Sequence, residues 1–120
     1  MTQIEQSLNG QISGEMRAVA ALEPRTSEEI RADIGNGHTV ILKSLLHDCA
    51  PVGVGKGLKI KVNANIGTSG YNEDPEMELK KLRAAIYYGA DAVMDLSTGG
   101  DIRAMRKAVI EESRVPVGTV

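Results

Sequence analysis

The order of strand-like and helix-like segments after residue 57 is the feature that most constrains how this chain folds. Leu58–Val62 alternates apolar and basic residues, which is the period of a β-strand. Asp74–Tyr88 carries apolar residues at helical spacing, Ala90–Met94 is a second short apolar strand, Asp101–Ser113 is a second amphipathic helix, and Val115–Val120 is a third strand. Strands that alternate with helices of this length form parallel βαβ units, so the sequence predicts an α/β fold.

Changes in composition divide the chain into three parts. Residues 1–11 are polar and aperiodic, which predicts a disordered arm. Residues 12–57 are predicted to be an N-terminal helical region followed by a loop, and residues 58–120 hold the βα units. Because three parallel strands cannot close a barrel and leave two open edges, we expect this chain to be the beginning of a larger α/β domain.

The helical region is defined by its capping residues. Ser13 is placed to cap a first helix, and Thr26 with Glu29 three residues later forms a capping box for a second. Thr39–Leu42 is compatible with a short strand. His47–Gly57 is rich in glycine and contains a proline, which predicts a loop.

The composition of the chain argues against several classes of function. The 120 residues include 14 basic and 16 acidic side chains, and the net charge of −2 argues against a nucleic-acid-binding or membrane-binding protein. The longest apolar run, Ala18–Leu22, is far below the roughly 20 residues that cross a bilayer. The polar N-terminus shows no signal-peptide pattern, and the single cysteine, Cys49, cannot form an internal disulfide, so we expect a cytoplasmic protein.

Two segments are candidates for a binding site, because ligands of parallel α/β folds bind at the carboxyl ends of the strands. Residues 63–68 and 94–100 are expected at these ends, and they contain Asn65 and Met94. Asn65 offers an amide and a carbonyl to a polar ligand, or it satisfies turn backbone. Met94 is either part of the rim or ordinary core at a strand end. The residues alone leave both alternatives open.

Further polar residues near these ends also allow two interpretations. Asp95 is either a base or the anchor of its loop. Residues 97–100 either bind an anion at the start of a helix or cap that helix. His38, His47 and Cys49 do not fit the spacing of a zinc site, and no arrangement of catalytic nucleophile and base is supported. The sequence therefore predicts neither a metal ligand nor a catalytic residue in this chain.

Several motifs carry a resemblance to a known family. Lys61–Ser69, Tyr88–Gly100 and Val115–Val120 resemble the hallmark motifs of the phosphomethylpyrimidine synthases, in the order found there. Ile12–Met16 and Pro51–Leu58 are similar to segments that precede these motifs in the family. The resemblance covers about residues 12–120, which is nearly the whole chain.

The resemblance implies a fold and an activity. Members are radical S-adenosylmethionine lyases of thiamine biosynthesis on a (β/α)₈ TIM barrel, so this chain is expected to form a partial barrel preceded by short helices. They convert 5-aminoimidazole ribonucleotide to 4-amino-5-hydroxymethyl-2-methylpyrimidine phosphate, and the full-length enzyme is expected to be a homodimer. In the family, the residues that match Asn65 and Met94 contact the substrate.

The resemblance also implies what this chain lacks. The full-length family uses a [4Fe–4S] iron–sulfur cluster, S-adenosylmethionine and zinc, whose cysteine and histidine ligands lie later in the family's sequence. Cys49, His38 and His47 match none of these ligands, so we expect a truncated chain that binds none of these cofactors and is inactive by itself. Two alternatives remain: a non-catalytic remnant that associates with a full-length synthase, and a generic βαβ module that binds phosphate ligands.

Overall fold

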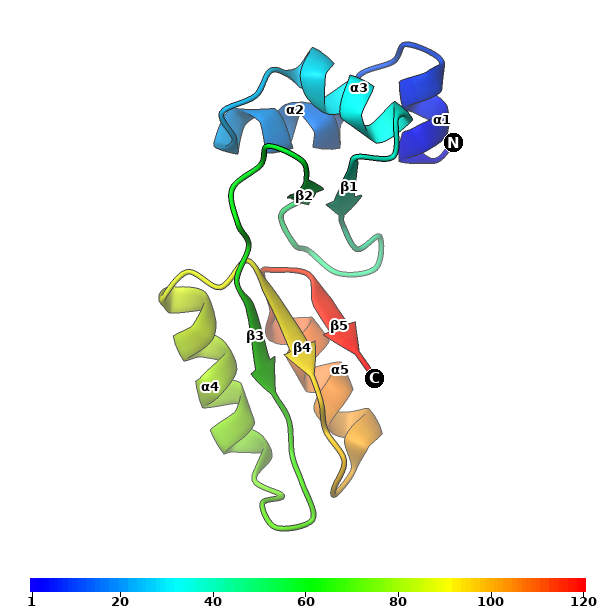
Figure 1. Cartoon of the computed structure of the whole chain (residues 1–120). Helices are drawn as coiled ribbons and strands as arrows, with labels where there is room; N and C mark the ends of the chain where they lie inside the picture. The colour runs from blue at the N-terminus through cyan, green and yellow to red at the C-terminus, as the bar shows by residue number, and fades with distance from the viewer. The chain divides into compact units, whose positions relative to one another are not determined.

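A computed structural model describes all 120 residues, which form two compact units. Met1–Lys43 and Pro51–Ile60 form the first unit, and Ser44–Ala50 and Lys61–Val120 form the second. The elements, labelled in Figure 1, are α1 (Gln3–Leu8), α2 (Gly14–Leu22), α3 (Ser27–Gly35), β1 (Thr39–Leu42), β2 (Val52–Gly55), β3 (Asn63–Ile66), α4 (Pro75–Tyr87), β4 (Ala92–Asp95), α5 (Ile102–Glu112) and β5 (Val117–Thr119). No helix combines the length and the apolar content that crossing a bilayer requires.

The first unit consists of three helices and a two-stranded antiparallel sheet. Its core is a cluster of buried aliphatic side chains from α2 and α3: Met16, Val19, Ile30 and Ile34. The predicted caps of both helices are confirmed. Ser13 Oγ accepts a hydrogen bond from the Met16 amide at 3.0 Å, and the hydroxyl of Thr26 accepts one from the Glu29 amide at 3.2 Å.

The predicted disordered arm is wrong, because its residues include helix α1. A capping box begins this helix: Thr2 Oγ1 accepts from the Glu5 amide at 3.2 Å, and Glu5 Oε2 accepts from the Thr2 amide at 2.6 Å. The buried Ser7 hydroxyl donates to the Arg31 carbonyl at 2.5 Å, and Arg31 Nη1 donates to the Ser7 carbonyl at 2.8 Å. Polar contacts therefore attach α1 to α3. The spacing of apolar residues in the sequence does not predict such contacts.

The predicted loop over His47–Gly57 is also wrong in part, because it contains strand β2. This strand pairs antiparallel with β1, which begins and ends where the sequence predicts. A Cβ atom at Gly53 would lie 2.5 Å from Val19 Cγ1 of α2. Glycine here marks a close approach between a strand and a helix, a role that composition alone cannot distinguish from that of a loop.

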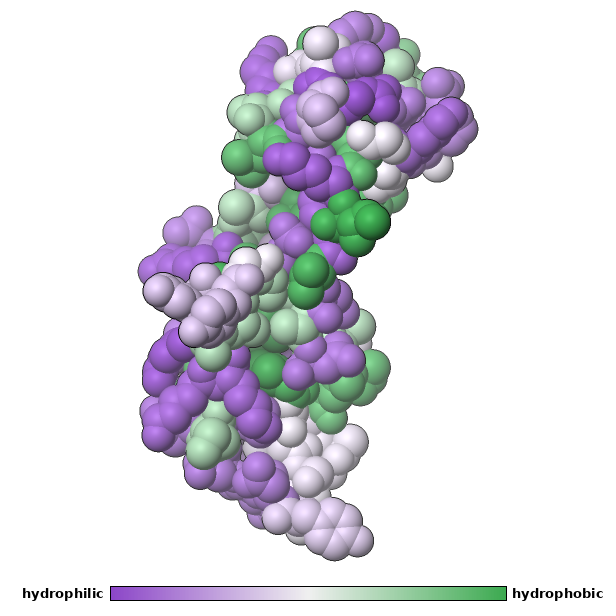
Figure 2. All heavy atoms as spheres, turned by 60° about the vertical axis from the view of Figure 1, so that its left-hand side comes forward, coloured by the Kyte–Doolittle hydropathy of each residue, from purple (hydrophilic) through white to green (hydrophobic).

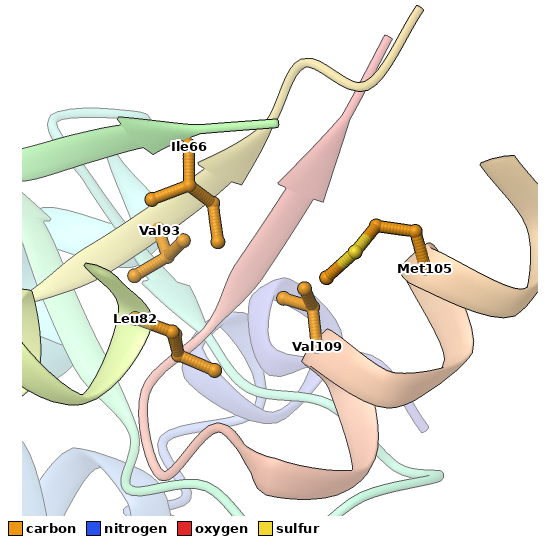
Figure 3. Packing of buried hydrophobic residues seen from close by; sticks show 5 residues of the cluster. All are labelled: Ile66, Leu82, Val93, Met105 and Val109. Carbon is orange, nitrogen blue, oxygen red and sulfur yellow. The ribbon is translucent and has the colours of Figure 1, made fainter. Parts of the chain in front are cut away.

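The second unit confirms the predicted parallel βαβ arrangement. Its sheet has the order β3-β4-β5, with both pairs parallel, and α4 and α5 pack on one face of it (Figure 1). Figure 3 shows side chains from the sheet and from both helices pointing toward one another; they are Ile66, Leu82, Val93, Met105 and Val109. The observed class is mixed α/β with small sheets, and the chain contains no closed barrel.

The first strand of this sheet lies later than predicted. Leu58 packs against the core of the first unit, and Ile60 is 95% exposed, so the alternation over Leu58–Val62 does not mark a strand. Strand β3 begins after Val62, whose amide donates to Asp91 Oδ2 at 2.8 Å and whose carbonyl accepts from the Asp91 amide at 2.9 Å. The predicted site residue Asn65 therefore lies within a strand and not after it.

The two predicted helices of the second unit are confirmed within one residue at each end. Asp74 caps α4 by accepting from the Met77 amide at 3.1 Å, and Asp101 caps α5 by accepting from the Ala104 amide at 2.9 Å. Hydrophilic side chains predominate over the outward face of α4 in Figure 2. On this helix, Glu76, Lys80 and Arg83 are exposed. The opposite side of the helix buries Leu82 completely.

Replacing Leu82 with alanine tests the core of the second unit. Since the side chain is fully buried, Leu82→Ala should lower the free energy of unfolding by about 2–5 kcal/mol, measured by urea denaturation. Met77→Ala on the same helix is the control, because Met77 is 42% exposed, and its effect should stay below about 1 kcal/mol. Equal effects of the two substitutions would contradict the assignment of the core.

Candidate functional site

The carboxyl ends of β3 and β4 form a polar rim, defined here as residues 65–69 and 94–99. Asn65 is the register partner of Met94, and Ile66 is the register partner of Asp95. Directly paired residues of neighbouring strands point to the same face, and such strands lie ~4.8 Å apart. The structure therefore brings the two predicted site residues, Asn65 and Met94, side by side.

The two faces of the sheet differ in character at this rim. Ile66 and Val93 point into the core beneath α4 and α5. Asn65 and Met94 alternate with them and so lie on the opposite face, where Asn65 is exposed and Met94 is half-buried. An amide and a thioether are thus presented together on the face that carries neither helix.

Beyond the strands, the two rim loops remain bonded to each other. The Leu96 amide donates to the Ile66 carbonyl at 2.8 Å, and the Thr98 amide donates to the Thr68 carbonyl at 2.8 Å. In addition, the Thr68 hydroxyl donates to the Gly99 carbonyl at 2.7 Å. These contacts extend the parallel pairing past the last strand residues and hold the rim as one piece.

A buried chain of hydrogen bonds ends at Asp95. The Thr68 amide donates to Ser97 Oγ at 3.1 Å, and the Ser97 hydroxyl in turn donates to Asp95 Oδ1 at 2.5 Å. The Ser97 amide donates to the same Asp95 oxygen at 3.0 Å. Asp95 Oδ2 faces Arg106 Nε of α5 at 3.6 Å. Because Asp95 is fully buried on the face opposite Asn65 and Met94, the structure favours its anchoring role over that of a base.

Glu78 of α4 supports the rim, and the sequence interpretation missed it. Its carboxylate is fully buried, and Oε2 accepts from the Gly67 amide at 2.7 Å while Oε1 accepts from Lys81 Nζ at 2.6 Å. Gly67 has a φ of +147°, and a Cβ there would lie 2.5 Å from the Ser97 amide nitrogen. The signal was present in the sequence, because Glu78 precedes Leu82 by four residues and so lies on the buried stripe of the helix.

The start of α5 does not offer an anion site. The Asp101 carboxylate caps the helix there, and its negative charge disfavours a second anion at the same terminus. A Cβ at Gly99 would collide with the backbone of Ser69 and Gly70, so Gly99 serves the contact between the loops. Neither interpretation of residues 97–100 fits this geometry, because the cap of α5 is Asp101, and Ser97 and Gly99 contact the other rim loop instead.

The side chains of this chain do not fit a cluster or a zinc ion. No group of three or more His, Cys, Asp or Glu side chains is arranged to hold a metal. Cys49 is buried, and its Sγ accepts from the Ser44 amide at 3.5 Å. His38 Nδ1 lies 3.8 Å from Asp33 Oδ1, which is one carboxylate neighbour and not a ligand set. An iron–sulfur cluster needs several cysteines, whereas this chain has one.

The fold defines an α/β protein of the parallel βαβ class, with a polar rim at the carboxyl ends of β3 and β4. Comparison with known proteins narrows this class. Residues 2–120 match the radical SAM ThiC family, and the chain belongs to that family.

Curated relatives agree with this assignment. The chain is 50% identical over 120 residues to phosphomethylpyrimidine synthase from Methanocaldococcus jannaschii and 49% identical over 120 residues to the synthase from Thermodesulfovibrio yellowstonii. It is 51% identical over 121 residues to the synthase from Carboxydothermus hydrogenoformans. Each alignment covers 100% of this chain and 28% of the relative. The chain therefore spans about a quarter of the length of the curated relatives that it matches.

Removing the Ser97 hydroxyl tests the bonds between the rim loops. Ser97→Ala leaves the buried Thr68 amide without its acceptor and should lower the free energy of unfolding by about 1–3 kcal/mol. Hydrogen exchange of the Thr68 amide should accelerate at the same time. The control is Thr98→Ala, because the exposed Thr98 hydroxyl lies 3.5 Å from the Thr68 carbonyl, and its effect should stay within about 0.5 kcal/mol. Unchanged exchange at Thr68 in the Ser97 variant would show that these bonds do not hold the rim.

Proposed function

We propose that this chain forms a substrate-contacting part of a phosphomethylpyrimidine synthase, in which Asn65 and Met94 bind 5-aminoimidazole ribonucleotide. The observation that carries the proposal is the direct pairing of these two residues on one face of the sheet. Membership of the radical SAM ThiC family supplies the class of reaction. The resemblance described above supplies the substrate and its product, 4-amino-5-hydroxymethyl-2-methylpyrimidine phosphate.

The two side chains suit complementary parts of such a nucleotide. The Asn65 amide can donate two hydrogen bonds and its carbonyl can accept, so it recognises polar edges of a base or sugar. The Met94 thioether is polarizable and makes favourable contacts with flat rings. Because the bonded loops hold the rim, the two groups meet the ligand in a fixed arrangement. This chain's contribution is therefore to bind and orient the nucleotide.

The surrounding architecture extends the proposal. The sequence predicts the βα units over residues 58–120. Since the second unit resumes at Lys61 and its sheet has three parallel strands with β3 and β5 outermost, we assign residues 61–120 to the first βα units of a (β/α)₈ barrel. The same family resemblance supports a homodimeric, cytoplasmic lyase. A [4Fe–4S] cluster with S-adenosylmethionine would supply radical chemistry to that enzyme, and zinc would be bound as well. The residues of this chain provide no ligand set for either metal group.

Replacing Asn65 tests the proposed contact. In ¹⁵N-resolved NMR titrations of the chain with 5-aminoimidazole ribonucleotide, Asn65→Ala should weaken binding roughly tenfold, because one hydrogen bond to the ligand is lost. Asn63→Ala is the matched control, since Asn63 lies on the same face two residues earlier and is also exposed. The control should bind the nucleotide as the unsubstituted chain does.

A second titration separates this function from a generic phosphate module. Inorganic phosphate should bind far more weakly than the nucleotide, because the proposed contacts recognise the base and sugar. Equal affinity for the two ligands would favour the generic module. Unchanged affinity of the Asn65 variant for the nucleotide would refute the assigned role.

A further inference from the structure

A third residue continues the row formed by Asn65 and Met94. Gly118 of β5 is the register partner of Met94, so the three positions lie side by side on neighbouring strands and share one face. Figure 1 shows β4 between β3 and β5. Across the sheet, the row therefore consists of the Asn65 amide, the Met94 thioether and the Gly118 backbone, which carries no side chain.

The Met94 side chain occupies the space above Gly118. A Cβ atom at Gly118 would lie 2.7 Å from Met94 Sδ and 3.3 Å from its Cε. Since β3 and β5 flank β4 on opposite sides, a sulfur atom at this position leans toward β5 and away from Asn65. Asn65 is exposed, and its amide remains open to a ligand beside the thioether.

The backbone itself does not require glycine at this position. Gly118 is not among the glycines with positive φ, so its conformation is open to any residue. The atoms in the way are the end of one flexible side chain, whereas at Gly99 the obstacle is backbone. A methyl group at Gly118 would therefore displace the thioether and leave the fold in place.

We propose that Gly118 is a positioning and specificity-determining residue, which sets the place of the Met94 thioether in the nucleotide site. The inference rests on the proposed function. Because Gly118 has no side chain, the Met94 thioether lies over β5, and the space in front of the Asn65 amide stays free for the nucleotide. An alanine at this position would push the thioether off β5 toward Asn65. The space left beside the Asn65 amide would then be too narrow for the flat ring of the nucleotide.

The first experiment needs no ligand. In the unsubstituted chain, the Met94 methyl protons should show an NOE to the Gly118 α-protons, and Gly118→Ala should shift the ¹³C resonance of that methyl group. The urea midpoint of the variant should stay close to that of the unsubstituted chain. Gly70→Ala is the control, because a Cβ at Gly70 meets nothing within 4 Å and its φ is not positive. Absence of the NOE overturns the inference, whether or not the variant folds.

The second experiment measures binding of 5-aminoimidazole ribonucleotide. Gly118→Ala should weaken it roughly tenfold, which is the size of an overpacking penalty of about 1.4 kcal/mol. In a Met94→Ala background the same substitution should change affinity less than about twofold, because the displaced group is gone. This loss of effect would show that Gly118 acts through Met94.

The outcomes separate this inference from the proposed function. If the nucleotide binds and Gly118→Ala leaves its affinity unchanged, the inference fails and the proposed function stands. An equal loss with and without the Met94 thioether also overturns the inference, because Gly118 would then act independently of it. If the unsubstituted chain does not bind the nucleotide, the proposed function fails, and the inference fails with it.

Discussion

The parallel register between β3 and β4 is the constraint on which the candidate site depends. A slip of one residue would turn every side chain of a strand to the other face, and Asn65 would then leave the face that carries Met94. Contacts at both ends of the pair oppose such a slip. Asp91 exchanges hydrogen bonds with Val62 where the strands begin. Beyond their carboxyl ends, the Thr68 amide is linked through Ser97 to the buried Asp95 carboxylate.

Both glycines and buried acidic side chains determine the conformation of this rim. Gly67 allows the backbone of one loop to approach Ser97 of the other, and the Glu78 carboxylate accepts a hydrogen bond from the Gly67 amide. The acids are buried because each accepts hydrogen bonds that offset the loss of water. The opposite face presents the neutral side chains of Asn65 and Met94 at this rim.

The sequence predicted the features that have a local cause. The Ser13 and Thr26 caps, the helical apolar stripes and the alternation of parallel strands with helices follow from short-range patterns, and the structure confirms them. The predictions were wrong where a contact between residues far apart in the sequence determines the local structure. The alternation at Leu58 reflects packing in the first unit, Gly53 lies in a strand against Val19, and α1 is attached through Ser7 and Arg31. For the site, strand ends and motifs indicated Asn65 and Met94. The helical spacing places Glu78 on the buried stripe with Leu82, but its partner, the Gly67 amide, lies in a loop that this spacing does not identify.

The most direct test of this account is the pattern of backbone NOEs between β3 and β4 in the isotopically labelled chain. The account predicts that Asn65 lies opposite Met94 and Ile66 opposite Asp95, with no NOE pattern for any other alignment. A pattern that places Asn65 opposite Val93 or Asp95 would put the amide and the thioether on different faces of the sheet. That result would contradict a shared nucleotide site at this rim.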